Sequence, residues 1–276
     1  MTKRTALLLT AIAVAVPILS VAIGRLLAAR RLRRDVDALF KIAPTGPPQI
    51  YHESQLAGLP APVQRYFRHV LREGQPYLRG LRLRHTGRFK TDLAKDWVPI
   101  EGEQYITADP PGFIWQGSTR QFVARDEYVA GRGGLTVRLL GAFPVVHGTG
   151  PHFDQGELQR WLAESAWLPT SLLPSAHLHW TAQDDHAARL TLAHAGQTVS
   201  CLVRFNERDE IEQSETQRYQ TETTRMPWVC RYGAYQERHG VRIPTSAEAS
   251  WLVARQRLPY AQFMVQDLDY SPLAPF

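Results

Sequence analysis

The segment Val199-Ser-Cys-Leu-Val-Arg-Phe205 indicates the fold most directly, because every second residue in it is apolar. Successive side chains of an extended chain point to opposite faces, so the odd-numbered residues would share one face and Arg204 would lie on the other. A period of two is typical of an antiparallel strand that buries one face. We therefore expect a single strand here, with its core face formed by Val199, Cys201, Val203 and Phe205.

The same alternation recurs through most of the chain after residue 80. It is found in Leu81–Arg84, Leu135–Leu139 and Ala247–Val253. Turn-forming residues separate the alternating segments at 109–112, 131–134, 184–185, 206–209 and 239–240. Roughly ten strands at this spacing predict a mainly β (α+β) fold. We expect a single long curved antiparallel sheet or half-barrel with two short packing helices, plus an N-terminal transmembrane helix.

Two segments of the β-rich region have a helical period. The first should begin near Pro60 or Pro62 and end at Gly74. Its apolar stripe consists of Val63, Tyr66, Phe67, Val70 and Leu71.

The second helical segment opens an insert at residues 154–175. Asp154 is a suitable N-cap, and Glu157 three residues later completes a capping box. Pro169 should end the helix, and the leucines around it need burial. The insert is therefore predicted to be a broken helix that packs against the sheet.

Residues 1–34 differ in composition from the rest of the chain. Thr5 to Gly24 carry no charge, and five arginines follow between Arg25 and Arg34. About 20 apolar residues suffice for a helix to cross a bilayer, so we expect a single-pass membrane anchor with a basic flank. Two other interpretations stay open: a signal peptide cleaved after the small residues of Ser20-Val21-Ala22, and a buried core helix.

The side of the membrane on which the main domain lies is not settled by the sequence. The five arginines favour a cytoplasmic domain under the positive-inside rule, but Lys3 and Arg4 precede the apolar segment. Cys201 and Cys230 could pair in an oxidising compartment or remain buried thiols in a reducing one.

The rest of the chain divides into a linker and one domain. Pro44, Gly46, Pro47 and Pro48 interrupt regular structure, so residues 35–50 are predicted to be a linker in which 35–42 could form a short helix. Residues 51–276 are predicted to form the antiparallel β-rich domain, which contains the insert.

The charge distribution argues against a nucleic-acid partner. The chain is formally +6, and residues 1–34 contain seven Lys or Arg and no acid, so the remainder has a net charge of −1. A nucleic-acid binder needs a basic face on its folded domain. The arginine cluster is better explained by contact with anionic lipid headgroups.

Few residues suggest catalysis or metal binding. Glu164 lies between Trp161 and Trp167, where a carboxylate among aromatic rings could act as an acid or base. His177 and His179 have the spacing of a strand metal pair but lack a third ligand, so no metal site is expected. The glycines at 131–134 lack the signature of a phosphate loop and are explained by a hairpin turn. No cofactor is predicted.

Large apolar side chains of the insert are the candidate ligand-binding residues. A β-rich domain with seven tryptophans can use such rings to line a cavity or to fill its core. We select those that the insert would place on the concave face of the sheet: Trp161, Trp167, Leu168, Leu172 and Trp180.

Several short motifs resemble a bacterial membrane-associated family built on a domain of unknown function. They are Leu59–Phe67, Gly112–Trp115, Arg125–Tyr128, Arg160–Thr170, Met226–Trp228 and Ile243-Pro244. The resemblance implies no activity and no catalytic residues. At the level of the fold, the pattern is similar to the lipoprotein-localisation (LolA/LolB-like) half-barrels, in which a curved sheet presents an apolar concave surface to acyl chains.

Three functions compete on this evidence. The first is a membrane-anchored protein that binds a lipid or another apolar ligand in a concave sheet. The second is a membrane-associated hydrolase or transferase that uses Glu164. The third is a structural or partner-binding envelope protein, which an exposed apolar patch would favour.

Overall fold

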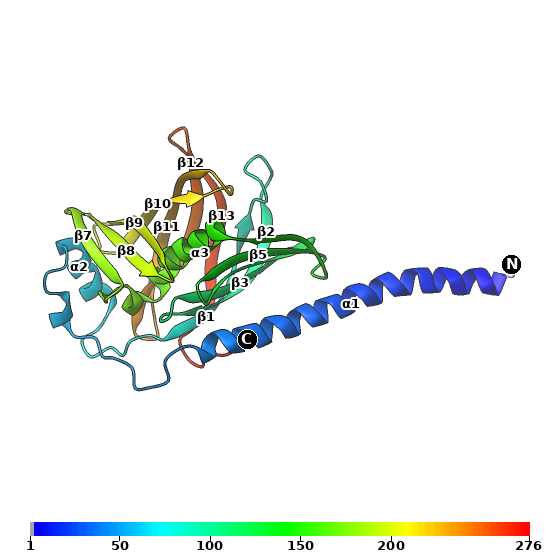
Figure 1. The fold of residues 1–276 in the computed structure, drawn as a ribbon, viewed down its shortest axis with the longest axis horizontal. Coiled ribbons are helices and arrows are strands. Elements are labelled where there is room, and N and C mark those ends of the chain that lie inside the picture. The colour runs from blue at the N-terminus through cyan, green and yellow to red at the C-terminus, as the bar shows by residue number, and fades with distance from the viewer. Residues whose placement is uncertain (1–2) are drawn as a thin grey trace.

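The described part of the chain forms one antiparallel sheet of thirteen strands (Figure 1). The computed structural model describes the backbone of residues 3–276 and the side chains of residues 19–276. The strands are β1 Gly80–Phe89, β2 Val98–Thr107, β3 Gly112–Ser118, β4 Phe122–Val129, β5 Arg132–Leu139, β6 Phe143–Thr149, β7 Leu178–Asp184, β8 Ala187–His194, β9 Gln197–Phe205, β10 Ile211–Tyr219, β11 Arg225–Arg238, β12 Val241–Val253 and β13 Gln256–Asp269. The predicted mainly β, antiparallel fold is confirmed, with more strands than expected.

Helices are few and lie outside the sheet. They are α1 Lys3–Lys41, α2 Ala61–Val70 and α3 Pro151–Glu164, with short 3-10 turns η1 Glu53–Leu56, η2 Ser165–Trp167 and η3 Pro169–Leu172. Helix α2 buries the predicted stripe, but it ends at Val70 rather than at Gly74. The strand predicted from 199–205 is β9, whose four odd-numbered side chains are buried while Arg204 is exposed.

The first and last strands of the chain, β1 and β13, are neighbours at the centre of the sheet. The strand order is β6-β5-β4-β3-β2-β1-β13-β12-β11-β10-β9-β8-β7. Strands β1–β6 run outward to one edge, and β7–β13 return from the other edge, so that β1 pairs with β13 along Arg82–Phe89. Two meanders of neighbouring strands therefore meet at one central seam.

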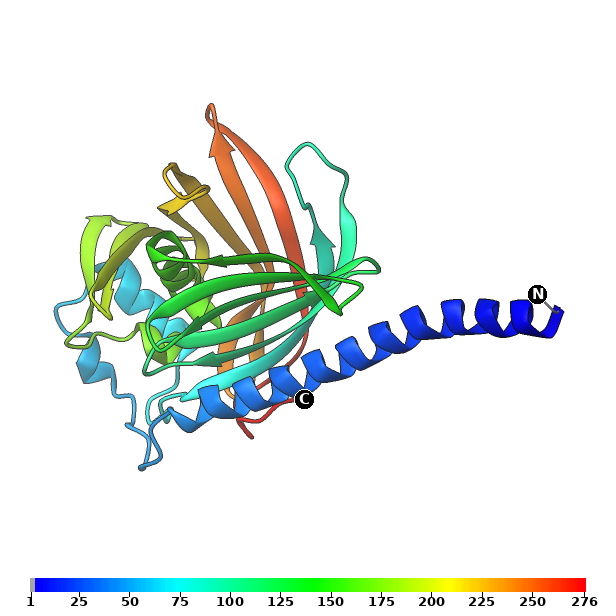
Figure 2. The same ribbon diagram turned by 45° about the vertical axis from the view of Figure 1, so that its right-hand side comes forward.

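This topology explains why α3 crosses the concave face. Strands β6 and β7 are consecutive in the sequence but lie at opposite edges of the sheet. The connection between them must span both wings, and α3 contacts β3–β6 on one wing and β9 and β10 on the other. Figure 2 shows the curved wings with α3 between them.

The main core lies between the concave face, α2, α3 and the 3-10 turns. It contains Phe67 of α2, Trp161 of α3, and inward-facing strand residues such as Leu83 and Phe205. Alternate residues of β2 show the two faces of the sheet: Ile106 packs in this core, whereas Tyr105 packs against α1 on the outer face.

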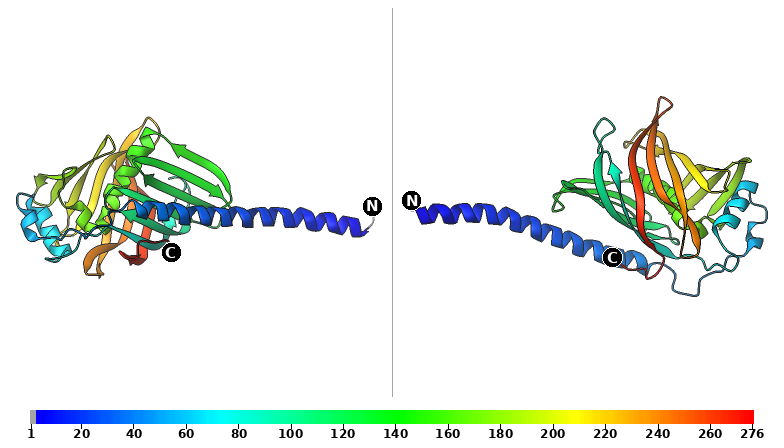
Figure 3. Two further views of the ribbon diagram at one scale, coloured as in Figure 1. Left: turned by 60° about the horizontal axis from the view of Figure 1, so that its bottom comes forward. Right: turned by 180° about the vertical axis from the view of Figure 1, so that it is seen from behind.

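The carboxyl-terminal part of α1 packs on the outer, convex face of the sheet. Val36 and Leu39 are fully buried against Tyr105 and Ile114, and Arg125 Nη1 donates to Asp35 Oδ2 at 2.9 Å. Residues 35–41 therefore continue the helix, and the irregular stretch begins at Ile42. The helix then extends away from the sheet toward its N-terminus (Figure 3).

The predicted transmembrane helix coincides with the N-terminal part of α1. Among the described residues, no helix reaches the length and apolarity that crossing a membrane requires. The side chains of 3–18 lie outside the described residues, and Leu19, Ile23, Leu26 and Leu27 are exposed.

Asp154 does not cap helix α3, contrary to the capping-box prediction. The helix starts three residues earlier, at Pro151, a position that suits the fixed φ of proline. Asp154 is buried in the first turn, where it accepts a hydrogen bond from the Gly133 amide at 2.8 Å. A Cβ on Gly133 would lie only 2.2 Å from Phe153 O, so glycine permits this close approach of β5 to the helix.

Candidate functional site

The concave face holds a cleft of about 900 Å³. Strands from both wings, helix α3 and the β1–β2 and β10–β11 loops line it. Much of the lining is aromatic or aliphatic, as at Phe122, Val137, Trp228, Trp251 and Phe263. This size and lining lie within the range of small-molecule sites in proteins.

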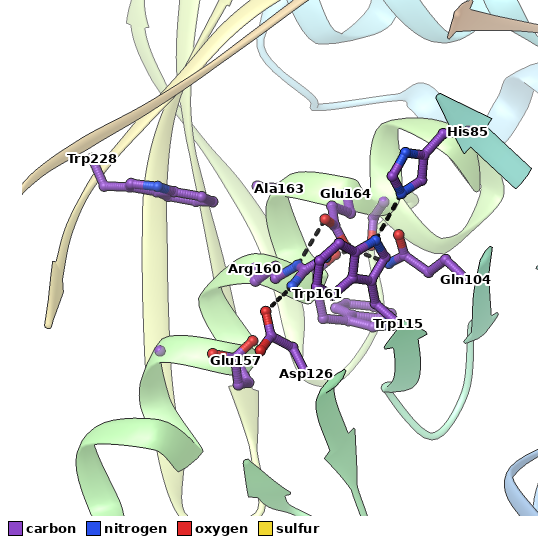
Figure 4. A network of polar contacts seen from close by, with 12 residues as sticks. His85, Gln104, Trp115, Asp126, Glu157, Arg160, Trp161, Ala163, Glu164 and Trp228 are labelled. Carbon is purple, nitrogen blue, oxygen red and sulfur yellow. Dashed lines mark hydrogen bonds and ion pairs between the residues drawn. The ribbon is translucent and has the colours of Figure 1, made fainter. Parts of the chain in front are cut away.

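One face of α3 forms the polar side of the cleft. Phe153, Gly156, Glu157, Arg160 and Glu164 line it at the i, i+3, i+4, i+7 and i+11 spacing of a single helical face. Asp126 of β4 and Arg218 of β10 approach this face from the two wings. We call Asp126, Glu157, Arg160, Glu164 and Arg218 the charged floor (Figure 4 draws all except Arg218 with labels).

Arg160 joins two of the three carboxylates of the charged floor. Its Nε donates to Glu164 Oε1 at 2.8 Å, and its Nη1 donates to Asp126 Oδ2. The guanidinium also lies over the rings of Phe113 and Trp115, 5.0 and 4.9 Å from their centroids. Burial opposes the charge of Arg160, but the neighbouring carboxylates outweigh it and raise its pKa. Arg160 therefore stays cationic.

Each carboxylate oxygen of Glu164 accepts a hydrogen bond from another side chain. Its second carboxylate oxygen accepts a hydrogen bond from Gln104 Nε2 at 2.5 Å. Gln104 is itself buried on β2, directly opposite Trp115 of β3. Both oxygens of Glu164 are therefore engaged by protein groups.

Arg218 and Glu157 form a second pair on the charged floor. Arg218 Nη2 donates to Glu157 Oε1 at 2.8 Å, and its Nε donates to the Gly156 carbonyl at 3.0 Å. The guanidinium lies over Trp228, 4.9 Å from the ring centroid. Each arginine of the charged floor thus combines an ion pair with an aromatic contact.

Glu157 is the least satisfied acid in the cleft. It is only 4% exposed, and its Oε2 has no hydrogen-bond partner. Burial raises the pKa of Glu157 to about 7, an effect opposed by Arg218 and reinforced by Asp126. The carboxyl group can therefore gain or lose its proton near neutral pH.

His85 supports the wall of the cleft from behind. Trp115 Nε1 donates to His85 Nε2 at 2.8 Å, and the imidazole stacks on Phe263 at 4.1 Å between centroids. Burial, together with the charge of Arg160, lowers the pKa of His85 to about 4. The imidazole is therefore neutral and fixes the orientation of Trp115.

The structure separates the five residues that the sequence proposed for ligand binding, and it places the catalytic candidate Glu164 as well. Trp167 and Glu164 line the cleft. The other four lie in the main core, away from the cleft: Trp161, Leu168, Leu172 and Trp180. The indole N–H groups of Trp161 and Trp180 are used internally, because they donate to the Thr107 and Leu172 carbonyls at 2.9 and 2.8 Å.

Sequence reasoning missed four of the five charged-floor residues, namely Asp126, Glu157, Arg160 and Arg218. A signal for two of them was present. Glu157, Arg160 and Glu164 recur at helical spacing on the face beside the Leu158–Trp161–Leu162 stripe. The other two approach from β4 and β10, and nothing in the local sequence indicates this.

The remaining candidates take no part in the cleft chemistry. His177 and His179 are exposed on and beside β7, and the described residues contain no group of three potential metal ligands. Cys201 and Cys230 are free and buried. Burial raises the pKa of both thiols, to about 12 for Cys201, which keeps them protonated.

Three solved structures are similar to the chain over most of its length. A LolA superfamily protein from Nitrosomonas europaea is 12% identical, with 77% of this chain and 93% of that chain covered and a TM-score of 0.37. A putative outer membrane lipoprotein-sorting protein domain from Vibrio parahaemolyticus is 8% identical, with coverage of 75% and 90% and a TM-score of 0.38. A DUF1329 family protein from Desulfovibrio piger is 9% identical, with coverage of 76% and 92% and a TM-score of 0.34. Two of the three are described as lipoprotein-sorting or LolA superfamily proteins, the group to which the sequence pattern is similar.

Comparison by sequence gives a family without an assigned activity. No curated protein matches the chain. Residues 49–263, which include every residue of the charged floor and most of the sheet, match a family of unknown function. The chain therefore belongs to the family of unknown function DUF6544.

Proposed function

We propose that the protein binds a lipid or another amphiphilic molecule in the cleft of its concave sheet. The observation that carries this proposal is the cleft itself: about 900 Å³, bounded largely by aromatic and aliphatic side chains. Protein interiors are normally packed to high density. An apolar volume of this size is therefore better explained by a ligand than by the needs of folding.

The central strand β12 supports the proposal. The sequence predicts a buried face for Ala247, Ala249 and Trp251, yet all three are only half-buried and line the cleft. Small side chains at 247 and 249 leave room above a strand in the middle of the sheet. Filling this room with larger residues would strengthen the core, so their small size is consistent with a binding site.

Replacement of Ala249 by Trp tests the proposal by filling the cleft. We expect the affinity for a 12-carbon alkyl probe to fall by about tenfold or more, which corresponds to a loss of about 1.4 kcal/mol or more of binding free energy. Quenching of tryptophan fluorescence reports binding, because Trp115, Trp167, Trp228 and Trp251 line the cleft. Ala193→Trp, at an exposed position on β8, is the matched control. Equal binding by both variants would place the ligand elsewhere.

We further propose that the protein works at a membrane to which the start of α1 attaches it. Support comes from the uncharged run Thr5–Gly24 and the arginines that follow it. Exposed apolar side chains continue along the helix at Leu19, Ile23 and Leu27. Flotation of the full chain with vesicles containing anionic lipid is the test. Serine at these three positions should reduce flotation, and 0.5 M salt should weaken the arginine contribution.

A hydrolase or transferase that depends on Glu164 has no specific contact in its favour. Both Glu164 oxygens are engaged by Arg160 and Gln104, and the residue is part of an ion-pair network that also explains its burial. We therefore propose binding as the activity of the cleft.

A further inference from the structure

The charged floor has more acidic than basic groups. Asp126, Glu157 and Glu164 supply three carboxylates, and Arg160 and Arg218 supply two guanidiniums. Arg160 is occupied by Asp126 and Glu164, and Arg218 by Glu157 and the Gly156 carbonyl. With every acid ionised, the floor has one negative charge in excess, inside a cleft whose walls are largely apolar.

The floor also contains a buried acceptor that has no hydrogen-bond partner. Glu157 Oε2 is buried without a partner, on a residue that lines the cleft. In Figure 4 its carboxyl group lies beside that of Asp126, at the point where α3 meets β4. A buried acceptor without a partner is costly, and a donor from a ligand would relieve the cost.

Aromatic rings that line the same cleft add a second feature that favours a cation. Trp228 already faces the Arg218 guanidinium at 4.9 Å, and Tyr260 accepts the indole N–H of Trp228 at 2.9 Å. Both residues line the cleft, as does Trp251, which stacks on Tyr260. Aromatic faces attract cations, most strongly where water is excluded.

From these observations we infer that the ligand has an apolar body and a cationic head group with N–H donors, such as a protonated amine, and that Glu157 binds this head group with Asp126 beside it. The inference rests on the proposed function, because it names the head group of the ligand that the cleft would bind. An anionic head group would instead meet a floor with one negative charge in excess, in which each guanidinium is already paired with a carboxylate.

A series of probes with one chain and different head groups tests the inference on the full-length protein. Dodecylamine, dodecanol and dodecanoate are titrated at concentrations at which each is monomeric, with the change in tryptophan emission and calorimetry as readouts. We expect the amine to bind about tenfold or more tightly than the alcohol, in keeping with a charge-assisted hydrogen bond, and the carboxylate to bind most weakly. If none of the three binds, the proposed function fails. If the alcohol or the carboxylate binds as well as the amine, the cleft binds ligands and the head-group inference fails.

Two lysophospholipids distinguish a membrane lipid from a free amine as the source of the head group. The ethanolamine head group has N–H donors, whereas the choline head group is a cation without them. Tighter binding of the ethanolamine lipid supports an aminolipid. Binding of dodecylamine alone supports a free alkyl amine. Binding of the choline lipid as tight as that of the ethanolamine lipid would overturn the requirement for N–H.

Glu157→Gln tests the residue directly. The amide can still accept from Arg218 but has no negative charge, so we expect the preference for amine over alcohol to fall to about twofold or less while alcohol binding is retained. Glu237→Gln, which removes a carboxylate of an exposed ion pair with Arg72 outside the cleft lining, is the matched control and should keep the preference. Unchanged amine preference in Glu157→Gln would overturn the assignment.

The pH dependence of binding gives a readout that does not need a variant. Arg218, Asp126, Arg160 and Glu164 face Glu157, and its pKa of about 7 makes the carboxylate predominate only above neutral pH. An alkyl amine keeps its proton throughout this range, like the lysine side chain. Amine binding should therefore weaken by about tenfold between pH 8 and pH 5.5, while alcohol binding stays constant. Amine binding that strengthens at low pH would contradict the inference.

Discussion

The two faces of helix α3 differ in chemistry although they belong to the same 14 residues. One face, with Leu158, Trp161 and Leu162, lies in the main core. The other presents Glu157, Arg160 and Glu164 to the cleft, where each carboxylate or guanidinium needs a partner from another element. The apolar stripe of this helix therefore determines where it packs, and its polar face determines what the cleft can bind.

The strongest test of this division is Trp161→Ala on the core face. Removal of a fully buried tryptophan should reduce the free energy of unfolding by about 3–5 kcal/mol, as measured by chemical denaturation. Ligand binding by the remaining folded protein should be unchanged, since Trp161 does not line the cleft. Trp97→Ala, at a half-buried position, is the control and should have a much smaller effect. Loss of binding with little loss of stability would reverse the assignment of the two faces.

Arg160→Met tests whether the charged face also contributes to stability. The change leaves Asp126 and Glu164 without their shared cation in a mostly buried site, so we expect a loss of about 3 kcal/mol at pH 7. Arg231→Met breaks an exposed pair with Glu212 and should cost less than about 1 kcal/mol. Equal effects from the two variants would show that the charged floor is solvated like the surface.

Glu157→Gln should change how stability depends on pH. The folded-state pKa of Glu157 lies above its ordinary value, at about 7, so the folded state binds this proton more tightly than the unfolded state does. The resulting stabilisation is complete below about pH 4.5 and is lost as pH rises toward 7, by on the order of 1.4 kcal/mol for each unit of pKa difference. Denaturation midpoints at pH 4.5, 5.5, 6.5 and 7.5 should fall less steeply in the variant. A slope equal to that of the wild type would assign the titration to another group.

The smallest effect is expected at the first turn of α3, where a buried and an exposed contact share one residue. Arg132→Gln removes an ion pair to Asp154, but the Arg132 side chain is 81% exposed. The cost should be about 0–1 kcal/mol and should vanish in high salt. Asp154→Ala also removes the acceptor of the buried Gly133 amide and should cost more. Similar thermal melts for the two variants would mean that the helix start is set by Pro151 alone.

The sequence predicts the strands well where one face is buried throughout. In β9 the alternation from Val199 to Phe205 reflects a local constraint, and the structure matches it residue by residue. In Ala247–Val253, by contrast, the face that the alternation predicts to be buried is only half-buried. Whether that face is covered depends on residues distant in the sequence, and they leave the cleft open above it. The turn at Ala254-Arg255 has positive φ at both residues without glycine, so no local signal marks it.

The site was harder to predict than the fold for a related reason. The pairs that define the charged floor link residues 34 and 61 positions apart, between α3 and two strands on different wings. Their meeting depends on the crossover of α3 between the sheet edges, which only the full strand order reveals. The helical spacing of Glu157, Arg160 and Glu164 could be recognised in the sequence, but the neighbouring apolar stripe was the stronger signal.

The pairing of β1 with β13 has a consequence for how the protein folds. Each wing is a run of hairpins between neighbours in the chain, whereas the seam joins residues as far apart as Arg82 and Asp269. Closing a long loop reduces the entropy of the chain before the contacts that offset this loss have formed. The local hairpins should therefore form first and the β1–β13 seam late. The cleft draws on both wings, and it would therefore be completed only in the final steps of folding. Pulsed hydrogen exchange should accordingly protect the amides bonded between β12 and β13 before those bonded between β1 and β13.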